Sequence, residues 1–300
     1  MREWAIIGVP TSAGAHHAGQ ELAPDALRAA GLPGRLRAAG MTVTDEGNLP
    51  GAVFERDHDS DSGSGRNLPA VARVARQVAD RVAEVAASGQ LPLVLGGDCT
   101  ITLGVVAGLR RGRPDLGLLY VDGDADLGVP GDDDGIFDSM GVAHLLGRGA
   151  PELAGLGGPP PLLEPSRLAI LGPDPRETTD AGRDFLAGLG VSYSEAPAFA
   201  ADPVAAAERA LAAVGGAAGP LLVHFDVDVV DSGDLPLGNF PHYGSGVRLE
   251  HAVRALQVLC AHPNLAGLVL TEVNPTHDPS GRELARLTDA LAAVLSPSAV

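Results

Sequence analysis

Acidic side chains gather at two points of the chain, each directly after an apolar run typical of a buried strand. Asp122, Asp124 and Asp126 follow Leu-Gly-Leu-Leu-Tyr-Val, and Asp226 and Asp228 follow Pro-Leu-Leu-Val-His-Phe. Carboxylates this close together cannot all stay ionised unless a cation compensates their charge. Hard divalent cations with oxygen ligands are the natural compensation. One such pair is usually a solvated turn or a helix cap, but two clusters after buried-type strands favour a metal site.

Two further strand ends carry reactive side chains. Cys99 follows Gly-Gly-Asp and precedes a helical pattern, and Glu272 ends the last apolar run in Thr-Glu-Val-Asn-Pro. A helix N-terminus beside Cys99 would favour its thiolate. Cys260 instead lies in an apolar helical stripe, so we expect it to be structural. In open α/β sheets ligands bind at the carboxyl ends of the strands, and all of these residues should therefore face one crevice.

The elements that must position these residues are strands alternating with helices. Several strands are continuous apolar runs, which indicates burial on both faces, as in a parallel sheet covered by helices. We predict a three-layer αβα sandwich around a doubly wound, mostly parallel sheet of about eight strands. The predicted strands are 3–9, 41–46, 91–96, 116–122, 167–172, 190–194, 220–227 and 266–272. The predicted helices are 23–39, 67–88, 100–111, 138–147, 179–188, 202–214, 248–261 and 280–295.

Two polar or Pro/Gly-rich stretches, 55–66 and 149–166, are predicted surface loops. Neither separates two self-sufficient cores, so we expect a single α/β domain over residues 1–300. With 45% hydrophobic residues in 300, the chain can form a sizeable core.

Composition excludes several classes of function. All 21 basic residues are Arg, which rules out a Lys Schiff base and a P-loop Lys. The net charge of −17 disfavours nucleic acid and anionic membrane as partners. Two Cys make no disulfide framework, and we find neither a signal peptide nor an apolar run long enough to span a bilayer. A cytoplasmic location is therefore expected.

In order and spacing, these motifs resemble the arginase–agmatinase–formiminoglutamase (ureohydrolase) superfamily over most of the chain. Its Asp-x-Asp-x-x-Asp motif is intact at residues 226–231, and its Glu-x-Asn-Pro motif at 272–275. The family's Gly-Gly-Asp-His-Ser motif appears as Gly-Gly-Asp-Cys-Thr at 96–100, and its Asp-x-His-x-Asp motif as Asp-Gly-Asp-Ala-Asp at 122–126. Two further segments, Ile-Gly-Val-Pro at residues 7–10 and the stretch at residues 23–32, resemble the N-terminal part of the family.

The resemblance implies a metal-dependent hydrolase of linear C–N bonds in a small cationic guanidine or amidine. Family members hold two divalent ions, usually Mn²⁺, whose bridging hydroxide attacks the guanidinium carbon so that urea leaves. Glu272 matches the carboxylate that holds the guanidinium group. A homo-oligomer, trimer or hexamer, is also implied. The metal ligands carried over are Cys99, Asp122, Asp124, Asp126, Asp226 and Asp228.

The sequence departs from the family at two neutral His ligands, which are Cys99 and Asp124 here. The six ligands would carry −6 if fully ionised, against −4 in the family, and this excess raises the pKa of the bridging water. Three outcomes stay open: one acid or the thiol keeps its proton, the thiolate selects Zn²⁺ or Fe²⁺ instead of Mn²⁺, or the site holds one ion or none.

The family's proton-shuttling His is also replaced. Asp138 falls closest to its position, so Asp138, Glu272 and Asp124 are the catalytic candidates. His144, in the next helix, is more typical of a structural residue.

Candidate substrate contacts lie on loops expected to border the crevice. Glu177 or Asp180 could bind an α-amino group, while Arg176 could bind a carboxylate. His16 borders the crevice, and Asn239, in a loop that also contains His242 and Tyr243, could recognise a substrate of different shape.

Two alternatives remain beside guanidine hydrolysis. One is formimino or amide hydrolysis on the same scaffold. The other is a catalytically altered or inactive member that binds a metal or ligand, or has a structural role.

Overall fold

One parallel sheet forms the centre of the computed structural model, which describes residues 2–56, 65–131, 135–215 and 219–296. Within these residues the sheet has eight strands in the order β2-β1-β3-β8-β7-β4-β5-β6, and every pairing is parallel. The strands are β1 Glu3–Val9, β2 Thr42–Asn48, β3 Leu91–Gly96, β4 Gly117–Val121, β5 Leu168–Leu171, β6 Ser192–Ser194, β7 Leu221–Asp226 and β8 Leu265–Thr271. All eight predicted strands are confirmed.

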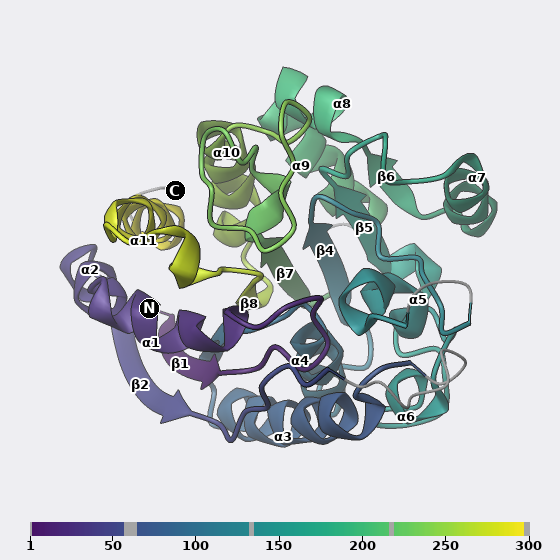
Figure 1. Cartoon of the computed structure of the whole chain (residues 1–300), viewed down its shortest axis with the longest axis horizontal. Helices are drawn as coiled ribbons and strands as arrows, with labels where there is room; N and C mark the ends of the chain where they lie inside the picture. The colour runs from purple at the N-terminus through teal and green to yellow at the C-terminus, as the bar shows by residue number, and fades with distance from the viewer. Residues whose placement is uncertain (1, 57–64, 132–134, 216–218, 297–300) are drawn as a thin grey trace.

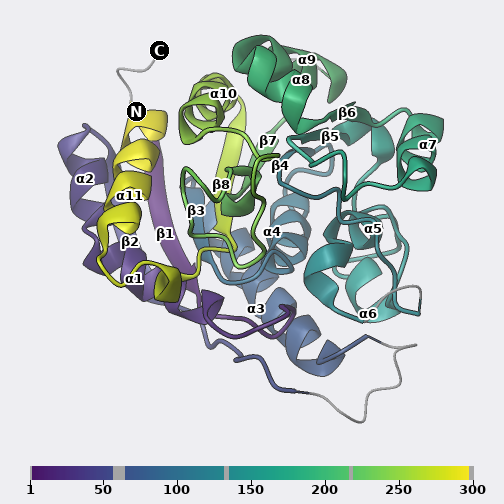
Figure 2. The same ribbon diagram turned by 45° about the horizontal axis from the view of Figure 1, so that its top comes forward.

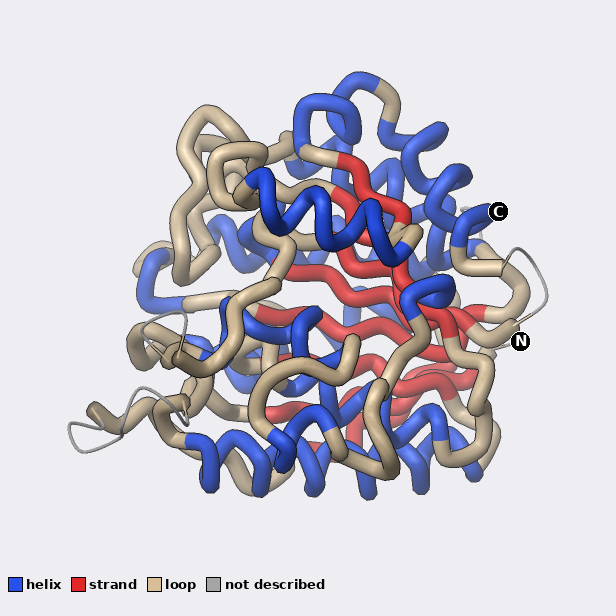
Figure 3. The backbone as a smooth tube through the Cα atoms, turned by 90° about the vertical axis from the view of Figure 1, so that its right-hand side faces the viewer, coloured by secondary structure: helices blue, strands red, loops and turns tan. Residues whose placement is uncertain are grey.

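Helices cover both faces of this sheet, as Figure 3 shows. They are α1 Ala23–Ala29, α2 Leu32–Ala38, α3 Leu68–Ala87, α4 Ile101–Arg110, α5 Gly141–Leu145, α6 Pro151–Ala154, α7 Asp180–Leu189, α8 Ala196–Ala201, α9 Pro203–Ala213, α10 Leu249–Ala261 and α11 Arg282–Leu295. One apolar core joins the sheet to α1, α2 and α8–α11, and the other joins it to α3–α7. This is the predicted three-layer αβα sandwich (Figures 1 and 2).

Buried central strands explain why the sheet is so regular. Every residue of β3, β4, β7 and β8 is buried, which matches their continuous apolar runs and leaves no solvent-facing side. The edge strand β2, by contrast, buries only Val43.

Local chemistry changed three predicted boundaries. The predicted helix 23–39 is divided into α1 and α2 at Gly31, whose φ of 87° is left-handed and ends the first helix. The predicted helix 138–147 begins as a 3-10 turn, Phe137–Met140, before α5. The predicted loop 149–166 contains the short α6, and residues 57–64 of the other predicted loop lie outside the described residues.

The strand order decides where the functional residues meet. Strand β8 lies between β3 and β7, and β7 pairs with β4. At the carboxyl ends of these four neighbouring strands, Cys99 follows β3, Glu272 follows β8, Asp226 ends β7 and Asp122 follows β4. None of the helices in the described ranges combines the length and apolarity needed to cross a lipid bilayer.

Candidate metal centre

A cavity of about 200 Å³ opens at the carboxyl ends of the four central strands. All six predicted metal ligands line it, and so do four of the other predicted site residues: His16, Asp138, Glu177 and Glu272. The structure does not bring Asp180 or Asn239 to this cavity. Asp180 is exposed and pairs with Arg183 at 2.6 Å, and the side-chain oxygen Oδ1 of Asn239 accepts a hydrogen bond of 2.9 Å from the side-chain amide of Asn274.

The first acidic cluster lies in the turn after β4. The backbone N–H of Asp124 donates to Asp122 Oδ1 at 2.8 Å, which closes the turn. Asp126 has a left-handed φ of 49°, a conformation that non-glycine residues adopt at an energetic cost and that is frequent at functional sites. Its Oδ2 accepts a hydrogen bond of 2.5 Å from the buried hydroxyl of Tyr120 on β4, and this bond fixes the orientation of the Asp126 carboxylate.

The second cluster, after β7, is joined to the first. Asp226 Oδ1 accepts from the backbone N–H of Asp228 at 3.0 Å, and its Oδ2 accepts from the Thr271 hydroxyl at 2.8 Å. The backbone N–H of Gly123, inside the first cluster, donates to Asp228 Oδ1 at 3.1 Å. The two acidic clusters therefore form one network.

The electrostatics of this network fit divalent cations. Burial, followed by repulsion from the neighbouring carboxylates, raises the pKa of Asp122 and of Asp226 well above its ordinary value. Burial likewise raises the pKa of Asp124 to about 6. These acids resist ionisation together unless positive charge compensates them, and oxygen donors in this number suit Mn²⁺ or a similar hard cation. The residues present therefore fit a metal centre.

The surroundings of Cys99 favour the thiol over the thiolate that the N-terminus of α4 was expected to favour. Burial, and then the nearby Asp126 charge, raises the pKa of the Cys99 thiol well above its usual range. Its Sγ donates to the backbone carbonyl of Asp138 at 2.9 Å and lies 3.6 Å from Asp126 Oδ2. Cys260 is buried, as expected of a structural residue.

Glu272 is held at the edge of the cavity by two donors. The backbone N–H of Cys99 and the side-chain amide of Gln20 each donate to one of its carboxylate oxygens at 2.9 Å. Its φ of 62° is left-handed. Burial, with the nearby Asp98 charge, raises the pKa of Glu272 to about 8. Gln20 was missed by sequence reasoning, because nothing in its local pattern indicates this long-range contact.

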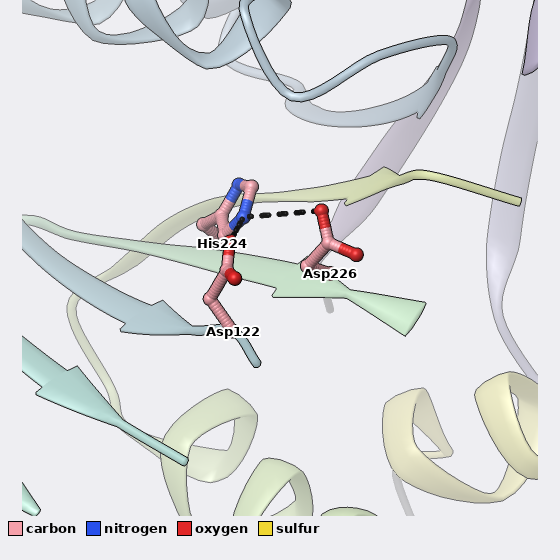
Figure 4. Close-up of side chains that lie close together, drawn as sticks. All are labelled: Asp122, His224 and Asp226. Carbon is pink, nitrogen blue, oxygen red and sulfur yellow. Dashed lines mark hydrogen bonds and ion pairs between the residues drawn. The ribbon is translucent and has the colours of Figure 1, made fainter. Parts of the chain in front are cut away.

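A buried imidazole that the sequence analysis did not single out, that of His224, lies beside the carboxylates of Asp122 and Asp226 (Figure 4). His224 Nε2 is 3.2 Å from Asp122 Oδ2 and 4.0 Å from Asp226 Oδ2, and its Nδ1 is 2.8 Å from the Thr102 hydroxyl. The ring stacks on Tyr120 with centroids 4.0 Å apart. Burial lowers the pKa of His224 to about 3, so the ring is neutral. Its position two residues before Asp226 on a strand, hence on the same face, was an available signal.

Asp138, His16 and Glu177 lie at the rim of the cavity. Asp138 Oδ1 lies 3.8 Å from His16 Nε2, and burial, with the Glu272 charge, raises the pKa of Asp138 well above its ordinary value. Glu177 lines both this cavity and an adjoining one of about 740 Å³. His144 is structural, as expected: its two ring nitrogens contact the backbone of Met140 and Ala150.

Comparison with known proteins identifies the family of this chain. The sequence model described as "Arginase family" matches residues 2–297. The chain belongs to the arginase family. It is 30% identical to human arginase-1 over 303 residues, covering 98% of this chain and 91% of that protein.

The solved structures of the arginase family are similar throughout the chain. Arginase from Bacillus caldovelox superposes with a TM-score of 0.88 at 26% identity, covering 98% of both chains. The fold alone is shared with the Trypanosoma cruzi formiminoglutamase determined with Mn²⁺, at a TM-score of 0.78 and 18% identity, covering all of this chain and 94% of that one. This chain therefore has the arginase-family hydrolase fold.

Proposed function

We propose that this chain is a metal-dependent hydrolase that cleaves a linear C–N bond in a guanidine or amidine, adding water and releasing urea or a urea analogue. One observation carries the proposal: six donor side chains from the ends of three strands, β3, β7 and β4, line a single cavity, and their carboxylates need a cation to be ionised together.

The proposed ligands of two ions are Cys99, Asp122, Asp124, Asp126, Asp226 and Asp228. Five carboxylates against one neutral thiol favour Mn²⁺, and Zn²⁺ or Fe²⁺ becomes competitive where Cys99 loses its proton. When bound, the ions supply an activated water and stabilise charge at the carbon that is attacked.

Glu272 is proposed to orient the substrate. The carboxylate of Glu272 faces the cavity, and Gln20 and Cys99 each donate a hydrogen bond to one of its oxygens. A planar guanidinium cation bound there would neutralise the negative charge of Glu272. Glu177 lies where the metal cavity meets the larger one, so it is placed to bind a positive group further along the substrate. Asp180 and Asn239 take no part in this proposal because they lie outside the cavity.

Asp138 is proposed to move the proton. Burial raises the pKa of Asp138, which favours the protonated carboxyl group, and this group can give its proton to the leaving amine as the C–N bond breaks. Asp124, whose pKa is raised to about 6, is proposed as a metal ligand whose charge also influences the pKa of the bound water.

A product-resolved substrate panel tests the proposal. The protein is freed of metal, supplied with Mn²⁺, Zn²⁺ or Fe²⁺, and given arginine, agmatine, guanidino acids and formimino compounds, with urea, formamide and ammonia measured separately. Urea release is the expected result, and Asp138→Asn should lower turnover by about 10²- to 10⁴-fold with metal content retained. Formamide without urea would favour the formimino alternative. Two bound ions without hydrolysis of any compound would overturn the proposal in favour of a binding or structural role.

Two further expectations belong to this proposal: a homo-oligomeric assembly, trimer or hexamer, and a cytoplasmic location. Light scattering on the purified protein tests the first, and fractionation of the source cells tests the second.

A further inference from the structure

A second imidazole reaches the acidic network from the loop after β7. His242 lines the metal cavity although only 2% of the residue is exposed to solvent. Its Nε2 lies 3.9 Å from Asp228 Oδ2. Among the described residues, this buried Nε2 has no hydrogen-bond partner. A buried ring nitrogen that faces carboxylates without a hydrogen bond is unusual and needs a physical reason.

The opposite side of the ring indicates which nitrogen has the proton. His242 Nδ1 lies 3.6 Å from Asp174 Oδ2. Arg176 clamps Asp174 through Nε and Nη2 at 2.7 to 3.1 Å. Burial raises the pKa of Asp174, but hydrogen bonds from Arg176 and Ser245 outweigh it and hold the pKa below its ordinary value. An ionised Asp174 favours the proton on Nδ1, which leaves the Nε2 lone pair directed into the cavity. Metal-binding His residues characteristically have such a carboxylate behind them.

The backbone of the first acidic cluster leaves room for this ring. A Cβ atom at Gly123 would lie 2.8 Å from His242 Nε2 and 2.9 Å from Asp228 Oδ1. A glycine between Asp122 and Asp124 therefore lets the nitrogen lie directly against the turn that carries the proposed ligands. Phe240 packs edge-on against the ring, with centroids 5.6 Å apart, and limits its movement.

We infer that His242 is a nitrogen ligand of the metal ion held by Asp124 and Asp228, so that the imidazole missing at position 124 is supplied by the loop after β7. The inference rests on the metal centre of the proposed function. His224 is the weaker candidate, because its Nε2 already contacts Asp122. Asp174 could form a site with Glu177 and His242, but Arg176 occupies its carboxylate, so Asp174 orients the ring.

Metal titration of the whole protein tests the inference without an activity assay. Metal-free wild type and His242→Asn are titrated with Co²⁺ and with Mn²⁺, and bound metal is measured by elemental analysis. Asn keeps an amide N–H near the position of Nδ1 but removes Nε2. We expect two ions per chain in the wild type, and in His242→Asn a second ion bound on the order of 100-fold more weakly. Gly123→Ala should weaken the same ion, and His251→Asn, on α10 outside the cavity, should weaken neither.

A spectroscopic measurement separates ligation from a merely structural role. In the Co²⁺ form, a metal-bound imidazole gives a strongly shifted N–H proton resonance that exchanges with solvent. The wild type should show such a resonance and His242→Asn should lack it. Two ions bound equally tightly by wild type and variant, with the resonance unchanged, would overturn the inference and leave the proposed metal centre standing. If His242→Asn does not fold, a two-ion wild type without any shifted imidazole N–H overturns it. If the wild-type protein binds no ion at all, the proposed metal centre itself is wrong.

Discussion

The carboxylate of Glu272 accepts a hydrogen bond of 2.9 Å from the backbone N–H of Cys99, 173 residues away in the chain. These residues follow β8 and β3, which are neighbours in the sheet. The contact fixes a proposed substrate-binding acid to the backbone of a proposed metal ligand. Substrate orientation and metal position are thereby set by the same pair of strands.

Replacing Glu272 with Gln should separate these two roles. Glu272→Gln removes the negative charge facing the guanidinium group, so we expect kcat/KM for guanidines to fall by about 10²- to 10³-fold. Metal content should be unchanged, because Glu272 is not a proposed ligand. Steady-state kinetics and elemental analysis check both, with Glu283→Gln on α11 as the control. Loss of metal in Glu272→Gln would contradict this assignment.

The Tyr120 hydroxyl should strengthen metal binding without touching the metal. It donates to Asp126 Oδ2, so Tyr120→Phe frees this carboxylate to rotate, and metal affinity should fall by about 10- to 100-fold. Titration calorimetry measures the change. Tyr193→Phe is a matched control, since that hydroxyl donates to Thr178 Oγ1 at 2.9 Å away from the acidic network. Equal affinities in Tyr120→Phe and wild type would show that Asp126 needs no such support.

Cys99 should influence which metal is chosen. Sulfur prefers softer ions than oxygen does, so Cys99→Ser should reduce Zn²⁺ retention relative to Mn²⁺ in a competition with equal concentrations of both ions. Cys260→Ser, which changes the other buried thiol, should leave the ratio unchanged. A Zn²⁺ to Mn²⁺ ratio that is identical in all three proteins would exclude Cys99 as a ligand.

Metal removal should reverse the usual effect of pH on stability. Folding raises the pKa of Asp124 from 3.8 to about 6 and that of Glu272 from 4.5 to about 8. The folded state therefore binds protons more tightly, so this stabilisation is complete below about pH 4 and is lost as the pH rises towards 8. The Tm of the metal-free protein should fall between pH 5 and pH 8, while saturating Mn²⁺ should remove this decline. A metal-free Tm that rises over this range would contradict the raised pKa values.

The sheet, and the grouping of most candidate site residues at one cavity, could be predicted from the sequence for a common reason. Strands such as β3 and β7 are continuous apolar runs, so their ends, and the acids that follow, are visible without tertiary information. The motifs containing Asp122, Asp226 and Glu272 lie directly at these ends, and a parallel sheet brings such ends to one edge.

The missed features depend on contacts between distant segments. His224 looks like one polar interruption of a core strand until its strand pairs with β4 and its ring meets Tyr120. The Cys99 pKa was misjudged because the degree of burial and the number of facing carboxylates outweigh a helix end. The role inferred for His242 needs Asp174 and Gly123 on either side of the ring, which no local pattern predicts.

The position of β8 has a consequence for how the protein is made. This strand begins only at Leu265, yet it joins β2-β1-β3 to β7-β4-β5-β6. During synthesis these two groups of strands must wait, each with an unpaired apolar edge, until β8 emerges and is inserted between them. Exposed edges of this kind favour aggregation. A ribosome that stalls before β8 would release a chain that can neither close its sheet nor assemble the acidic cavity, and the demand for chaperones should be greatest at this stage.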